Sequence, residues 1–93
     1  MPKPTKSSAI RNNLARNIRY ARVMLSWSQE ELAEHAQLHR NLIGMIERKE
    51  CAVTLDTLND LSKALKVEPW VLLQPPSVAQ PQILSLLDKS AGR

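Results

Sequence analysis

Arg40 and Asn41 are adjacent side chains with hydrogen-bonding groups that read DNA bases. Arginine pairs bidentately with O6 and N7 of guanine in the major groove, and asparagine pairs with N6 and N7 of adenine. Arg48 and Lys49 lie further along the same segment and carry positive charge, which is the kind of group that contacts phosphate. These residue types predict a surface that binds double-stranded DNA, if one helix presents them together.

Positive charge is concentrated at the N-terminal end of the chain, whose formal net charge is +4. The first acidic residue is Glu30, and all charged residues before it are basic: Lys3, Lys6, Arg11, Arg16, Arg19 and Arg22. This asymmetry is typical of a protein that binds a polyanion, although a solvated basic tail explains the charge alone equally well. The two lysines are expected to follow the DNA backbone or the minor groove.

Other residues that carry chemistry are sparse. His35 and His39 have no carboxylate placed to make either of them half of a catalytic pair. Cys51 is the only cysteine, which excludes an internal disulfide and leaves no zinc-ligand spacing. It is either a small half-buried residue or a redox switch. The sequence therefore predicts no enzyme, no metal site and no cofactor.

Composition favours one small domain made of helices. The chain has 93 residues and no phenylalanine, and its aromatic residues are Tyr20, Trp27 and Trp70. Leucine, isoleucine, valine and alanine supply nearly all of the apolar content, which indicates an all-α fold. No segment has the roughly 18 apolar residues of a membrane span, and the N-terminus lacks the apolar core of a secretory signal. We expect a cytoplasmic protein with no membrane partner.

Periodicity divides the chain into three parts. Residues 1–9 are polar and contain two prolines, so they are expected to form a flexible basic arm. Residues 10–74 form the compact domain, whose first helix has an apolar stripe made of Ile10, Leu14, Ile18, Ala21 and Leu25. Residues 75–93 form a proline-containing tail. Its segment from Gln82 to Lys89 suits a short helix that must dock on the domain, dock on a second subunit, or fray.

Capping signals place the next helices. Ser28 and Glu31 have the spacing of a capping box, and Trp27 and Leu32 have the spacing of a hydrophobic staple. A second helix therefore begins at Ser28. A turn at 37–39 leads to a third helix that ends near Arg48, so the two form a helix-turn-helix unit. Downstream, the pattern predicts a helix after an N-cap at Thr54 and a short one over residues 70–73.

The run from Ile18 to Leu73 resembles the phage repressor and Cro type (XRE-like) of helix-turn-helix domain. SQEELAEHAQLHRNLIGMIER carries the resemblance, and VTLDTLNDLSKALKVEPWVLL follows as the last two helices of that family. The family includes controller proteins of restriction-modification systems and many antitoxins. The resemblance implies a five-helix lambda-repressor-like DNA-binding domain. Here a short C-terminal extension follows it, either helical or irregular.

The resemblance also implies roles for individual residues. Glu47 is expected to form a structural salt bridge with Arg22. The implied base contacts are Arg40, Asn41, Gly44 and Met45. The implied phosphate contacts are Arg22, Ser28, Gln29, His39, Arg48 and Lys49. The implied dimer interface comprises Cys51, Val53, Trp70, Val71 and Leu73. Gly44 is either the point where the helix backbone approaches the groove or a tolerated weak position.

Three positions depart from the family pattern, which commonly has glycine where this chain has Ser26, Gln37 and Lys49. The last two often need a positive φ, which costs a residue other than glycine about 1 kcal/mol. The function implied is a homodimeric repressor that binds a near-palindromic operator through its third helix. The alternatives are an antitoxin that binds a toxin through its tail and an interaction module that does not bind DNA. Polymerase is a further possible partner.

Overall fold

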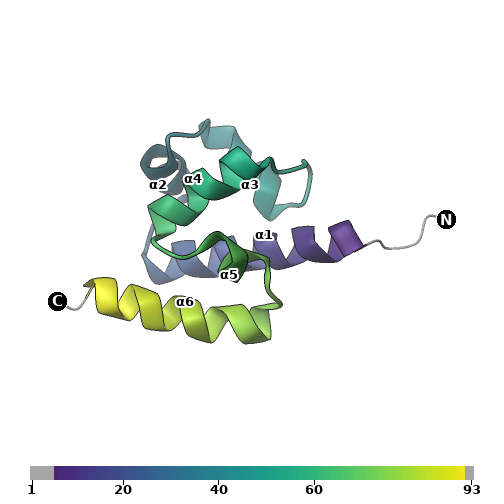
Figure 1. Cartoon of the computed structure of the whole chain (residues 1–93). Helices are drawn as coiled ribbons and strands as arrows, with labels where there is room; N and C mark the ends of the chain where they lie inside the picture. The colour runs from purple at the N-terminus through teal and green to yellow at the C-terminus, as the bar shows by residue number, and fades with distance from the viewer. Residues whose placement is uncertain (1–5, 92–93) are drawn as a thin grey trace.

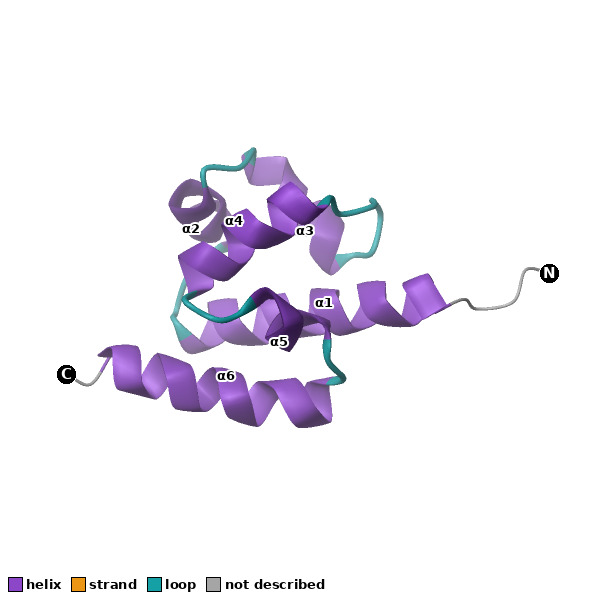
Figure 2. Ribbon diagram, viewed as in Figure 1, coloured by secondary structure: helices purple, strands orange, loops and turns teal. Residues whose placement is uncertain are grey.

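A computed structural model describes residues 6–91 and contains six helices in this range, with no strand. They are α1 (Lys6–Met24), α2 (Gln29–Ala36), α3 (Arg40–Glu47), α4 (Leu55–Leu65), α5 (Pro69–Leu73) and α6 (Pro76–Ala91). Helices α1 and α6 lie side by side, and α2, α3 and α4 gather on the other side of α1 (Figure 1). Short loops join all of the helices (Figure 2). The expectation of an all-α fold is confirmed.

Helix α1 carries most of the expected apolar stripe. Leu14, Ile18 and Ala21 are buried, whereas Ile10 is 45% exposed. The helix begins at Lys6, earlier than the predicted start at Ile10, so residues 6–9 are helical and do not belong to an arm. Residues 1–5 of the expected arm, including Lys3, lie outside the described residues.

The predicted capping box is present at the start of α2. The backbone N–H of Glu31 donates to Ser28 Oγ at 3.0 Å, and the backbone N–H of Ser28 donates to Glu31 Oε1 at 2.7 Å. Trp27 packs at the edge of the core, where its ring is stacked on that of His35 with centroids 4.0 Å apart. These contacts fix where α2 begins and how the preceding chain approaches it.

Within residues 6–91, four residues other than glycine have a left-handed backbone. Three are the positions where the family commonly has glycine, Ser26, Gln37 and Lys49, with φ of 60°, 59° and 62°. The fourth is Lys66 at the end of α4, with φ of 60°. The left-handed turn at Gln37 lets the chain leave α2 and enter α3 after only three residues. The helix-turn-helix geometry is therefore kept without the glycine.

The core lies where the helices meet. Its fully buried side chains include Leu32 from α2, Ile43 from α3, and Leu61 and Leu65 from α4. The buried residues Ala33 and Ala36 of α2 are small, so α3 and α4 pack closely against this helix. None of the described helices has the length and apolar content needed to cross a membrane.

Helix α6 differs from the expected tail. It begins at Pro76, well before the predicted start at Gln82, and continues through Pro81. Its residues Ala79 and Ile83 are fully buried, and Leu87 is 6% exposed. All three belong to the main apolar cluster of the domain. The compact unit therefore extends past residue 74, because α6 completes the core beside α1.

Candidate nucleic-acid interface

The N-terminus of α3 presents the two predicted base-reading residues. Arg40 and Asn41 are the first residues of the helix and both are exposed. His39 is the N-cap: its Nδ1 accepts a hydrogen bond from the backbone N–H of Asn41 at 3.1 Å. His39 thus orients the start of α3, and this bond leaves Nε2 as the ring nitrogen available to an external partner.

A largely buried ion pair holds α3 against α1. Arg22 donates to both carboxylate oxygens of Glu47, from Nε at 2.8 Å and from Nη2 at 3.0 Å. Its Nη1 donates to the backbone carbonyl of Trp27 at 2.9 Å. The side chains are 13% and 4% exposed, so water screens this pair little. Glu47 therefore fixes the orientation of α3, and Arg22 has most of its donors engaged inside the protein.

Gln29 joins the same network. Its Nε2 donates to Glu47 Oε1 at 3.0 Å, which links the start of α2 to the end of α3. The sequence predicted that this amide, with Ser28, contacts phosphate. In the structure the Gln29 amide donor points inward, and the Ser28 hydroxyl caps α2. A phosphate at this corner would therefore meet the N-terminal end of α2, with its backbone amides, before these side chains.

Gly44 is buried, and the side chains of Arg48 and Gln29 fill the space where a larger residue would carry its Cβ. A Cβ atom there would lie 2.9 Å from Arg48 Nη1 and 3.2 Å from Gln29 Oε1. The guanidinium of Arg48 therefore folds back over α3 at Gly44. The space beside Gly44, where the helix backbone was expected to approach the groove, is filled by the Arg48 and Gln29 side chains, one of which must move if the groove is to come close.

These residues line one shallow concavity of about 380 Å³ at the surface of α2 and α3. The lining residues are Gln29, Glu30, Arg40, Asn41, Gly44, Met45 and Arg48. All four predicted base-contacting residues are thus brought together, and Met45 is half-buried among them. Glu30 is the lining residue that the sequence did not suggest, because nothing local distinguishes it from an ordinary acidic residue in the first turn of a helix.

The cations around this concavity have weak partners within the chain. Arg40 Nη1 lies 3.6 Å from Glu30 Oε2, and both side chains are more than 70% exposed. Arg48 Nε lies 3.0 Å from Glu50 Oε1, and this pair is also exposed. Exposed pairs are worth about 0–1 kcal/mol, so an incoming phosphate or base replaces them at little cost.

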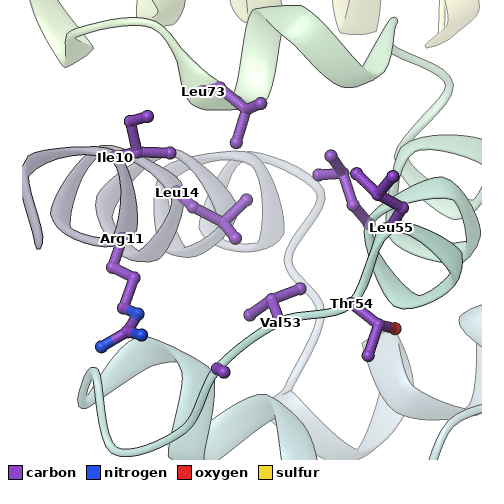
Figure 3. Close-up of a pocket in the computed structure, with 9 residues that line it drawn as sticks. Ile10, Arg11, Leu14, Val53, Thr54, Leu55 and Leu73 are labelled. Carbon is purple, nitrogen blue, oxygen red and sulfur yellow. The ribbon is translucent and has the colours of Figure 1, made fainter. Parts of the chain in front are cut away.

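A second feature lies away from this surface. A groove of about 260 Å³ runs between α1, the loop before α4, and α5 (Figure 3), and it is lined by Ile10, Arg11, Leu14, Ala52, Val53, Thr54, Leu55, Leu58 and Leu73. Leu55 is 81% exposed at its edge. It was not among the predicted interface residues, because its spacing with Leu58, Leu61 and Leu65 is that of a core-facing helix stripe.

The predicted interface residues fall into three groups. Val53 and Leu73 line the apolar groove, and Cys51 is half-buried in the same loop as Val53. Trp70 is 61% exposed on α5. Val71 is only 3% exposed and belongs to the core, so its assignment to an interface is wrong. Helix α5 is a single short turn, and its inward side carries Val71 and Leu72.

Comparisons with known proteins agree with this architecture. Residues 18–69 match the helix-turn-helix family HTH_3. The chain is 54% identical to the control protein C.SmaI of Serratia marcescens over 64 residues, which are 69% of this chain and 76% of that protein. It is 50% identical to the control protein C.BamHI of Bacillus amyloliquefaciens over 46 residues, which are 50% of this chain and 57% of that protein.

A solved structure extends the likeness to nearly the whole fold. The crystal structure of a hypothetical transcription factor from Neisseria aligns with a TM-score of 0.74 and 34% identity, covering 88% of this chain and 93% of that one. This coverage exceeds the helix-turn-helix match and agrees with a core that includes α6. The chain belongs to the XRE-type helix-turn-helix family of DNA-binding transcription regulators.

Proposed function

We propose that this protein is a homodimeric repressor that binds a near-palindromic operator by inserting α3 into the major groove. The observation that carries the proposal is the single concavity that gathers Arg40, Asn41, Met45 and Arg48 beside the N-terminus of α2. Arg40 has the geometry to read a guanine and Asn41 an adenine, while Met45 supplies apolar surface for a thymine methyl group. The relation to control proteins and to a transcription factor supports this role.

Base reading requires α3 to be held rigidly. The bonds from Arg22 and Gln29 to Glu47 hold the C-terminal end of α3, and the His39 cap orders its N-terminal end. Arg48 is the C-cap of α3 and folds back over the helix, and Lys49 comes next in the chain, so phosphates on either side of the groove meet positive charge.

The apolar groove supports the dimeric part of the proposal. A single protomer reads too few bases for a selective site, whereas two copies related by a two-fold axis place two α3 helices about 34 Å apart in successive major grooves. Leu55 and Val53 at the groove offer apolar surface for a second copy of this chain. Occupancy of a promoter by such a dimer represses transcription without an effector domain.

The test begins with selection of bound sequences from random duplex DNA. Replacing Arg40 with alanine should weaken binding to the selected sequence by about 5- to 150-fold, the equivalent of 1–3 kcal/mol, and relax preference at one base pair. Lys63→Ala removes one exposed positive charge on α4 and is the matched control. Unchanged sequence preference in the Arg40 variant would remove α3 from the base-reading role.

The dimer is tested by sedimentation of Leu55→Asp beside Leu84→Asp. Both leucines are exposed, on α4 and α6 respectively. The Leu55 variant should sediment as a monomer and lose operator affinity, while the Leu84 variant should behave as the unmodified protein. Equal behaviour of the two variants would remove the apolar groove from the interface. Transcription from a promoter that carries the selected site should fall when the protein is added.

A further inference from the structure

Helix α1 has a basic stripe that the proposed contacts leave unused. Asn12, Arg16 and Arg19 are spaced at i, i+4 and i+7, so they lie on one face of the helix. Both arginines are exposed, and neither belongs to an ion pair among the described side chains. Because no acidic residue precedes Glu30 in the sequence, nothing on α1 neutralises them.

This stripe is continuous with the surface proposed to hold DNA. Lys49 Nζ donates to Asn12 Oδ1 at 3.2 Å, which places the ammonium group at the end of α3 directly on the α1 face. Helices α1 and α3 also pack against each other. From Asn12, Arg16 is about 6 Å and Arg19 about 10 Å further along the helix axis. Positive charge therefore runs from the end of the proposed recognition helix along two turns of α1.

We propose that Arg16 and Arg19 bind the DNA phosphodiester backbone next to the phosphate contacted by Lys49, and so extend the footprint of each protomer without reading sequence. This inference rests on the proposed DNA binding. A guanidinium pairs bidentately with phosphate oxygens, and exposed arginines without an internal partner give up little to do so. The result is a non-specific contribution to affinity that decreases with salt.

The alternative to DNA on this face is an acidic segment of another protein. Arg16 and Arg19 also line a shallow groove of about 360 Å³ with Tyr20, Val23 and Gln80, between α1 and α6. The contact between Lys49 and Asn12 favours DNA, because it joins the stripe to the proposed phosphate surface. If this groove bound a protein segment, replacing the two arginines would leave binding to DNA alone unchanged. Measuring DNA binding by the arginine variant therefore distinguishes the two occupants.

The experiment measures binding of the full chain to the selected operator and to an unrelated duplex between 50 and 200 mM salt. The variant is Arg16→Gln/Arg19→Gln. The control, Lys63→Gln/Lys66→Gln, removes two exposed charges from the C-terminal end of α4. Each phosphate contact contributes about 0.9 to the slope of log affinity against log salt. The variant should therefore have a slope smaller by about 1.8 per protomer on both duplexes, while the control keeps the original slope.

Between 50 and 200 mM salt, a slope difference of about 1.8 means that the unmodified protein loses about 12-fold more affinity per protomer than the variant loses. Base preference at the operator should be the same in both. A variant slope equal to that of the control would overturn the proposal for α1. If the unmodified protein bound no duplex at all, the proposed function would itself fail, so the two failures are distinguishable. Circular dichroism of each variant checks that the helices are intact.

Discussion

Replacing Glu47 with alanine should lower the free energy of unfolding by about 3 kcal/mol. Glu47 accepts three hydrogen bonds, two from Arg22 and one from Gln29, and its side chain is 4% exposed. Removing one partner of a buried ion pair costs about 3–5 kcal/mol, because the other charge stays buried without compensation. Arg22 is 13% exposed and keeps its bond to the carbonyl of Trp27, so the lower end of this range applies.

The assay is thermal and urea unfolding followed by circular dichroism, at one fixed protomer concentration because the proposed dimerisation would make the measured stability depend on concentration. In a domain of this size 1 kcal/mol corresponds to about 4–8 °C, so the Tm should fall by about 12–24 °C. Glu30→Ala is the control, since Glu30 is exposed and its pair with Arg40 is 3.6 Å long. Its cost should stay below about 1 kcal/mol.

A second variant tests the cause of the loss. Arg22→Met/Glu47→Leu replaces both charges with apolar side chains, which is often neutral when a buried pair is removed whole. The double variant should therefore recover most of the stability lost by Glu47→Ala. A loss below about 1 kcal/mol for Glu47→Ala, or a double variant less stable than the single one, would refute the argument that burial of an unpaired Arg22 dominates.

Three smaller changes are checked by the same unfolding measurements. Ser28→Ala should cost about 1 kcal/mol, because it removes the hydroxyl that caps α2. Lys66→Gly should stabilise the protein by about 0.5 kcal/mol, since relief of the left-handed strain exceeds the added flexibility of the unfolded chain; a lower Tm would contradict this. Pro81→Ala should stabilise it by about 2 kcal/mol by restoring a hydrogen bond inside α6; an unchanged Tm would contradict that.

Features encoded by neighbouring residues could be predicted from the sequence. The capping box at Ser28 needs only Glu31, three residues away, and it is present. The left-handed turns at Gln37 and Lys49 occur where the family pattern has glycine. These signals are local, because short-range hydrogen bonds and backbone sterics depend little on the rest of the fold.

Features that depend on distant contacts could not be predicted. Asn17 lies on the first helix without any local signal, yet it is fully buried. Its Nδ2 donates to the carbonyls of Leu72 at 2.9 Å and Gln74 at 2.8 Å, more than fifty residues away in sequence. Only the packing of α5 against α1 creates this site. In the candidate nucleic-acid interface, the sequence pointed to Gly44. The position of the Arg48 side chain over it could not be predicted, because it depends on side-chain conformation and on Gln29 from another helix.

Helix α6 shows how tertiary packing can override a local signal. A proline inside a helix costs about 3 kcal/mol, which is why the predicted helix began at Gln82, just after Pro81. Full burial of a side chain such as Ile83 or Leu87 stabilises by about 1.5–3 kcal/mol, and both are almost completely buried. Together they exceed the cost of the proline. The same packing buries Ile83 and Leu87, on the apolar face that an antitoxin-like tail would offer to a toxin, so α6 is part of the core of the domain.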